Sequence, residues 1–152
     1  MRSLAYTLAL ILLAVASYLG ARYWRASAPV ELLNPGMACD LGREACLHRL
    51  PDGGEVRIDL SPRPVPLMQP VRLRVSVSNT ALQPAFLEIS GLNMEMGINR
   101  VPLQADGGGK WHGETIIPIC SQRRMHWRAM LMLRNGVDSY RLDDEFHTAR
   151  PR

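Results

Sequence analysis

The feature that most limits the fold of this chain is an uncharged apolar run near its amino terminus. The run extends from Leu4 to Gly20, reads LAYTLALILLAVASYLG, and is rich in leucine, alanine and isoleucine. Its length lies at the short end of the roughly 17 to 25 residues that form a transmembrane helix. Tyr23 and Trp24 follow it with aromatic side chains of the kind that favour a membrane interface. We therefore expect residues 1–25 to form an uncleaved membrane anchor.

A cleaved signal peptide is the alternative interpretation of this segment. Ala26-Ser27-Ala28 matches the small-x-small pattern of a cleavage site. Arg22 and Arg25, however, lie between the apolar run and that site, where a signal peptide normally has a short uncharged stretch. We favour the anchor on this ground, and the alternative stays open.

The charges that flank the anchor bear on its orientation. Arg22 and Arg25 follow the helix, whereas only Arg2 and the amino terminus precede it, so the positive-inside rule would place the rest of the chain in the cytoplasm. That rule is weakest where so few charges differ, and the following domain has the character of an exported protein. We expect a single-pass bacterial inner-membrane protein with its carboxyl-terminal domain in the periplasm.

Residues 26–53 are expected to form a linker and a small cysteine loop. Cys39 and Cys46 lie close together in the sequence MACDLGREAC. In an exported protein this spacing suits a disulfide, which the chain-entropy model values at about 2 to 3 kcal/mol for so short a loop. A metal-binding pair is a weaker alternative, because the CxxC spacing of zinc and redox sites is absent.

From residue 54 to residue 152 the sequence follows a period of two, the pattern of strands with one buried face. It is clearest at Val71–Val77, where valine and leucine alternate with arginine and serine. Asn135-Gly136 is the strongest turn signal, because a type I′ hairpin needs positive φ at both central positions. Short strands without an amphipathic helix among them predict an all-β, immunoglobulin-like antiparallel sandwich. The expected strands are Glu55–Leu60, Val71–Val77, Ala85–Ser90, Asn99–Gln104, Lys110–Ile117, Met125–Leu133 and Val137–Phe146.

One face of the strand expected at Met125–Leu133 is entirely apolar and should lie in the core. Its members are Met125, Trp127, Ala129, Leu131 and Leu133. We also expect Trp111 to face the core, from a strand adjacent to that of Trp127. Met130 and Met132 then lie on the outer face, where two exposed methionines could mark a contact surface.

Sulfur-bearing residues are the most unusual feature of the domain. Met94 and Met96 are two positions apart in GLNMEMGINR, and an extended loop would project both thioethers to one side. Thioether and thiolate sulfur are soft ligands that favour Cu(I). Cys120 would complete such a site if its loop packs against that of Met94, with Met125 or His126 as a fourth ligand. The alternative is that both methionines fill gaps in the core and that Cys120 is a buried, inert thiol.

The sequence indicates no other chemistry. It has no nucleophile elbow, phosphate loop, HExxH or CxxC motif, so we expect no enzymatic activity. The carboxylates of Asp143-Asp144-Glu145 are expected at a solvated strand end, and His48, His112 and His147 on the surface. The formal charge of +4 comes from scattered arginines and a single lysine, Lys110, a distribution that does not match a nucleic-acid-binding surface.

The portion from about Val71 to Tyr140, under half of the chain, resembles the FixH-like and YtkA-like domains, which are membrane-anchored periplasmic β-sandwiches of bacteria. The resemblance rests on an M-x-M-G motif, a following leucine, a G-G-x-W-x-G turn and strand, and an M-x-W motif: Met94, Met96, Gly97, Leu103, Gly108, Gly109, Trp111, Gly113, Met125 and Trp127. The chain lacks the paired histidines and longer methionine arrays of better-known periplasmic copper chaperones.

The resemblance implies copper handling and the assembly of respiratory haem-copper oxidases. It further implies that the partners are the inner membrane together with a respiratory oxidase or a copper chaperone. The alternative function is a metal-free structural domain that contacts an inner-membrane complex. The distance between the sulfurs of Met94, Met96 and Cys120 in the fold discriminates between the two.

Overall fold

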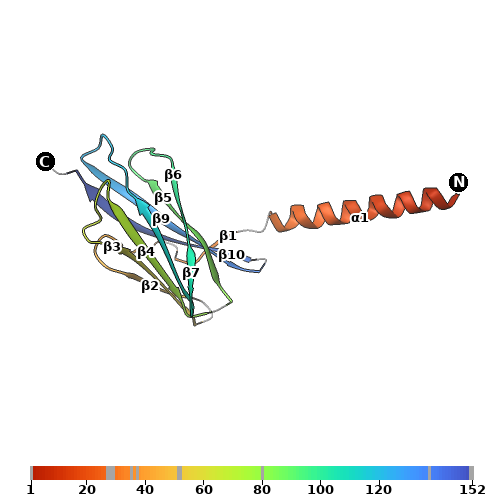
Figure 1. Cartoon of the computed structure of the whole chain (residues 1–152), viewed down its shortest axis with the longest axis horizontal. Coiled ribbons are helices and arrows are strands. Elements are labelled where there is room, and N and C mark those ends of the chain that lie inside the picture. The colour runs from red at the N-terminus through yellow and green to blue at the C-terminus, as the bar shows by residue number, and fades with distance from the viewer. Residues whose placement is uncertain are drawn as a thin grey trace.

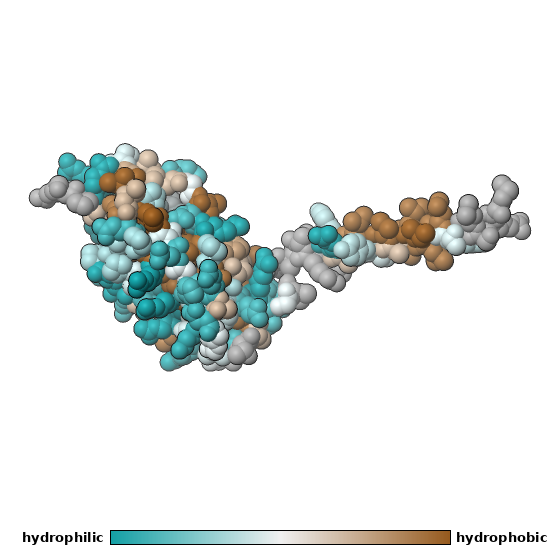
Figure 2. All heavy atoms as spheres, viewed as in Figure 1, coloured by the Kyte–Doolittle hydropathy of each residue, from teal (hydrophilic) through white to brown (hydrophobic). Residues whose placement is uncertain are grey.

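The chain consists of one long helix followed by a β-sandwich (Figure 1). The computed structural model describes residues 2–26, 30–34, 36, 38–50, 53–79, 81–136 and 138–150. Helix α1 (Arg2–Ala26) contains the window Tyr6–Tyr23, which has a mean hydropathy of 1.4 and is 0% buried. Figure 2 shows apolar side chains along much of the helix surface. The helix is therefore long and apolar enough to span a membrane.

Two five-stranded sheets make up the sandwich (Figure 1). The first sheet, in spatial order, contains β1 (Val30–Leu32), β10 (Asp138–Ala149), β9 (Arg124–Asn135), β5 (Gln83–Gly91) and β6 (Ile98–Pro102). The second sheet, in spatial order, contains β2 (Cys46–Arg49), β3 (Glu55–Ser61), β4 (Pro70–Val77), β8 (Lys110–Ile116) and β7 (Gln104–Gly107). β1 pairs with β10 in parallel, and the other pairings between these strands are antiparallel.

The all-β sandwich expected from the period of two is confirmed. The inward-facing residues of β4 and β9 are buried, whereas arginines, other polar residues and the partly exposed Met130 and Met132 alternate with them on the outer faces. Gly136 has the positive φ, 59°, that the Asn-Gly signal predicted. Asn135 does not have positive φ, because it is still the last residue of β9 and pairs with Asp138.

The sandwich begins earlier in the chain than the period of two indicated. β1 and β2 both come from residues 26–53, the segment expected as linker and cysteine loop, so the folded unit extends back to Val30. β7 is a further strand whose residues are all exposed. Strands of three or four residues offer too few positions for a period of two to stand out.

The two tryptophans of the domain do not lie on adjacent strands. Trp127 on β9 is 1% exposed, but Trp111 lies on β8 in the opposite sheet and is only partly buried. Trp127 stacks on Phe146 with ring centroids 6.2 Å apart, and its indole N–H donates to Thr148 Oγ1 at 2.9 Å. Trp127 is therefore a central core residue, whereas only part of the Trp111 side chain is buried against the core.

The cysteine loop joins the two sheets along one edge of the sandwich. Cys39 and Cys46 form a disulfide, as the spacing suggested. The backbone of Glu145 on β10 bonds to the residues on either side of Asp40. Its N–H donates to Cys39 O at 2.9 Å, and its carbonyl accepts the backbone N–H of Leu41 at 2.8 Å. Since Cys46 begins β2, the disulfide connects a segment paired with the first sheet to the edge strand of the second.

A buried histidine–carboxylate pair lies beside this disulfide, where a surface histidine and a solvated strand end were expected. His48 on β2 is 9% exposed and Asp144 on β10 is 0% exposed, so both expectations were wrong. His48 Nε2 lies 2.8 Å from Asp144 Oδ2, and Asp144 Oδ1 accepts the backbone N–H of Cys39 at 3.1 Å. The pair is buried because it lies between the two sheets, at the edge where the disulfide joins them. His112 and His147 are exposed, as expected.

Candidate metal site at the distal end of the sandwich

Two loops meet at the end of the sandwich opposite to the one where β1 begins, which we call the distal end. Residues 92–97 follow β5 and residues 117–123 precede β9. Gly91 of β5 pairs with Trp127 of β9, which sets the two loops side by side. The loops are also joined through Asn93, which donates to Arg124 O at 3.0 Å and accepts the backbone N–H of His126 at 3.0 Å.

The sulfurs of Met94 and Cys120 are in contact across these two loops. Met94 Sδ lies 3.7 Å from Cys120 Sγ, although the residues are 26 positions apart in the sequence. Cys120 is a free thiol and is 8% exposed, and Met94 is partly buried against the core. The folded chain thus brings together one thioether and one thiol in a partly enclosed position.

Polar groups around the thiol fix its position. The backbone N–H of Gln122 donates to Cys120 Sγ at 3.3 Å, and the Ser121 hydroxyl lies 3.5 Å from Met94 Sδ. The Arg150 guanidinium donates to the carbonyl of Cys120 and so attaches the loop to the end of β10. Ser121 and Gln122 were not predicted as part of the site. Their position directly after Cys120 in the sequence could have indicated them.

Gly91 permits the tight turn that folds the Met94 loop back over the end of β5. A Cβ at this position would lie 2.2 Å from the carbonyl oxygen of Met94 and 3.1 Å from Cε of Met125. A backbone atom at 2.2 Å cannot be accommodated without moving the loop, so a side chain at residue 91 would displace Met94. Glycine is the residue that allows backbone to pass this close.

The other predicted thioether ligands take different positions. Met125 is 3% exposed on the inner face of β9, and its Cε contacts the same glycine that lies under Met94. Met96 packs partly buried against the core, and no sulfur contact of Met96 is recorded among the described residues. Met125 is therefore close to the Met94 loop, and Met96 packs against the core from the same loop as Met94.

His126 lies on the outer face of β9 and is separated from the sulfurs by the strand. Its ring stacks on His147 with centroids 4.3 Å apart, and Nε2 lies 2.5 Å from Glu145 Oε2. Desolvation, together with the charges of His126 and Arg124, lowers the pKa of the His147 imidazole. Because neighbouring residues on a strand point to opposite faces, the structure brings Met125 but not His126 to the inner side.

The sulfur spacing fits a soft metal ion. If two metal–sulfur bonds of about 2.3 Å meet at a sulfur–metal–sulfur angle of about 120°, the two sulfurs lie about 4.0 Å apart. This value is close to the 3.7 Å between Met94 Sδ and Cys120 Sγ. Across the described ranges, no group of three or more His, Cys, Asp or Glu side chains is arranged to hold a metal ion. A site at the distal end would therefore depend on thioether sulfur, the ligand type that favours Cu(I) over harder divalent ions.

A comparison of the chain with family models, with curated proteins and with solved structures gives no match. No residue role is therefore taken from a relative.

Proposed function

We propose that the chain is a membrane-anchored periplasmic protein that binds Cu(I) at the distal end of its sandwich and takes part in the assembly of respiratory haem-copper oxidases. The contact of 3.7 Å between Met94 Sδ and Cys120 Sγ carries the proposal. Met125 contacts Gly91 beside the Met94 loop, and Met125 and Met96 are the candidates for further ligands. The Cu(I) ion would be cargo that the domain holds and passes on.

Three features support this function. The two sulfurs come from separate loops, and Gly91 leaves room for the Met94 loop to turn tightly back over the end of β5. Helix α1 exposes leucine and isoleucine on all sides, as a membrane-spanning helix does. The β-sandwich has the fold that the resemblance of the motifs to FixH-like and YtkA-like domains implies.

Competition with a chromophoric Cu(I) chelator tests copper binding by the full chain in detergent without oxygen. Ascorbate keeps the copper reduced and leaves the disulfide intact. We expect the parent to withdraw one Cu(I) per chain. A Met94→Ala, Met96→Ala double variant should bind more weakly, by at least the roughly 10- to 100-fold that follows loss of an outer-shell partner.

Single variants sharpen this experiment. Met94→Ala should weaken binding more than Met96→Ala, because Met94 is the residue whose sulfur already touches Cys120. Met130→Ala is the matched control, since it removes one thioether from the outer face of β9. A parent that takes no copper from the chelator, or a double variant that binds as well as the parent, would mean that GLNMEMG serves packing alone.

A metal-free interaction domain is the second candidate function, and exposed apolar residues at the distal end favour it. Their relative exposures are 68% for Ile98, 51% for Ile116, 48% for Ile119 and 37% for Leu92. Apolar groups gathered at one end of a soluble domain commonly mark a contact with another protein. The same residues would suit a copper-exchange partner, so the chelator experiment decides between the two functions.

Fusions at the carboxyl terminus test the proposed membrane topology. We expect alkaline phosphatase to be active and green fluorescent protein to be dark, because disulfides such as Cys39–Cys46 persist in oxidising compartments. The phosphatase activity should sediment with membranes. Activity in the soluble fraction would favour a cleaved signal peptide, and fluorescence without phosphatase activity would place the domain in the cytoplasm.

A further inference from the structure

Cationic side chains gather on the outer face of the second sheet. Arg57 of β3 is paired in register with Ser76 of β4, and Ser76 is paired with Lys110 of β8, so the three form one row across the sheet. Arg74 is the next outward-facing residue of β4. Strands lie about 4.8 Å apart, so the backbones of Arg57 and Lys110 are roughly 10 Å apart with only a serine between them.

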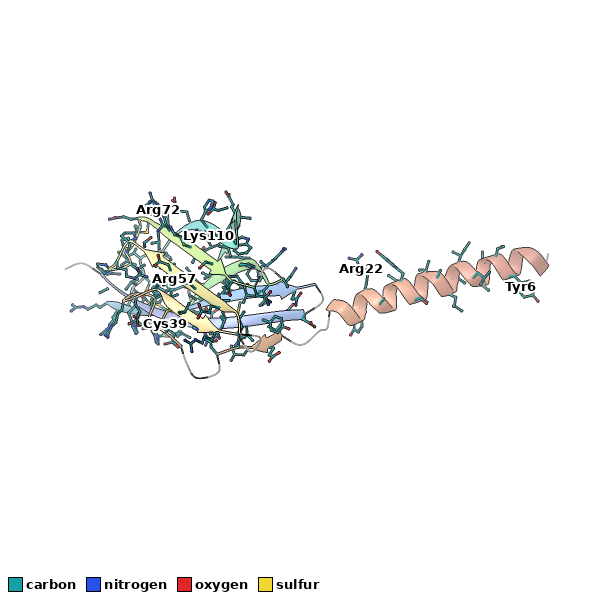
Figure 3. All side chains as sticks on the ribbon, turned by 90° about the horizontal axis from the view of Figure 1, so that it is seen from below. Tyr6, Arg22, Cys39, Arg57, Arg72 and Lys110 are labelled. Carbon is teal, nitrogen blue, oxygen red and sulfur yellow. A yellow bond between two sulfur atoms is a disulfide. The ribbon has the colours of Figure 1, made fainter. Side chains whose placement is uncertain are left out.

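This row lines a groove of about 360 Å³ on the sheet surface, whose other lining residues are Asp59, Val75, Asp106 and Trp111. Figure 3 shows Arg57, Arg72 and Lys110 on this part of the domain. The small Ser76 side chain leaves space between the longer cationic ones. The groove therefore offers three cationic side chains and a hydroxyl to a single anionic group.

The nearby carboxylates already have partners. Asp59 Oδ1 accepts a bond from Arg63 Nη2 at 2.6 Å, and Asp106 Oδ1 lies 2.7 Å from His112 Nδ1. Arg57, Arg74 and Lys110 form no ion pair with any residue that the structure describes. The cationic groups of the groove thus remain available to an external anion.

The anchor holds this face close to a membrane. Helix α1 ends at Ala26 and β1 begins at Val30, and four residue steps span at most about 14 Å. Ser76 and Lys110 lie next to the strand connections at the end of the sandwich where β1 begins, so the groove is at the end that follows the anchor. Trp111 also lines the groove, and tryptophan is a side chain enriched at membrane interfaces, which favours a lipid surface over an acidic protein.

We propose that the groove formed by Arg57, Arg74, Ser76 and Lys110 binds the phosphate groups of anionic lipids in the membrane that anchors the chain. The domain then lies with its second sheet toward the lipid. This inference rests on the membrane anchorage proposed above, and it is independent of copper binding.

The single lysine of the chain makes the proposal testable. The full chain is reconstituted in nanodiscs of phosphatidylcholine alone or with phosphatidylglycerol, and acylation of Lys110 by a succinimidyl ester is followed by mass spectrometry. We expect acylation to be about fivefold slower in the anionic discs, which corresponds to roughly 1 kcal/mol for one cation at an anionic surface. Raising the salt concentration should remove the difference.

Variants and soluble phosphate separate the possible causes. The double variant Arg57→Glu, Arg74→Glu should abolish the protection of Lys110 from acylation. If this charge reversal unfolds the domain, the double variant Arg57→Gln, Arg74→Gln replaces it in the same test. Arg134→Glu, on the other sheet, should leave it intact. An Arg128→Lys variant adds a reporter amine on the outer face of β9, which should react equally fast in both kinds of disc.

Three outcomes would overturn the inference. Equal reactivity of Lys110 in both kinds of inserted disc would show that the groove does not contact anionic lipid. Equal protection by inorganic phosphate in phosphatidylcholine discs would identify a site for soluble phosphate compounds. Protection that survives the Arg57 and Arg74 changes would place the contact elsewhere. Failure of the chain to enter any disc would instead contradict the anchorage on which the inference rests.

Discussion

Replacing Trp127 by alanine should leave little folded protein. The side chain is 1% exposed, stacks on Phe146 and donates its indole N–H to Thr148, so its removal creates a cavity and leaves the Thr148 hydroxyl without that partner. Truncation of a buried tryptophan typically costs about 3 to 5 kcal/mol, a large part of the roughly 5 to 15 kcal/mol that stabilises a domain. Thermal unfolding of the full chain in detergent, followed by near-ultraviolet circular dichroism, measures the loss.

Trp111→Ala provides the matched control. Trp111 is only partly buried and lies in the other sheet, so its loss should lower the melting temperature less than the loss of Trp127 does. Trp127→Phe should be intermediate, because a ring still fills most of the space while the hydrogen bond, worth about 1 kcal/mol, is lost. A Trp127→Ala variant that melts like the parent would contradict the assigned core.

His48→Ala should also destabilise the domain strongly, at a position far from any proposed ligand. It would leave the carboxylate of Asp144, which is 0% exposed, with only the backbone N–H of Cys39 as its recorded partner. Removing the hydrogen-bond partner of a buried polar group costs about 1 to 3 kcal/mol, and more where that group is charged, because the group stays buried without compensation. Thermal unfolding with the disulfide kept oxidised measures this effect.

The chain offers a control for this prediction with the same chemistry and a different burial. His112 and Asp106 are 2.7 Å apart, but both side chains are 49% exposed. Exposed pairs contribute about 0 to 1 kcal/mol, so His112→Ala should change the melting temperature little. Equal effects of His48→Ala and His112→Ala would contradict the account of the buried pair.

The long strands were predictable because alternation along them reports burial directly. Val71–Val77 and Met125–Leu133 were assigned correctly, including the face that each turns to the core. The same alternation could have found the buried carboxylate, since Asp144 falls in phase with Leu142 and Phe146, and His48 in phase with Cys46 and Leu50. The pairing itself could not be predicted, because His48 and Asp144 are 96 positions apart and meet only when two sheets pack.

The sequence indicated which sulfur-bearing residues could bind a metal, but it indicated only part of their arrangement in the fold. The spacing of Met94 and Met96 drew attention to one loop, and the leftover Cys120 drew attention to the other. Their meeting depends on the register of β5 with β9, which the sequence does not specify. The period of two already places His126 and Met125 on opposite faces of one strand, so the two side chains cannot reach one ion from the same side of the sheet.

The central claim is that sulfurs from two loops bind one Cu(I), and copper X-ray absorption of the loaded full chain tests it most directly. With oxygen excluded, we predict a first shell of sulfur atoms at about 2.3 Å, a length typical of metal–sulfur bonds. Cys120→Ser should reduce the number of sulfur neighbours and the copper retained. A spectrum dominated by nitrogen or oxygen neighbours, or one unchanged by Cys120→Ser, would contradict the claim.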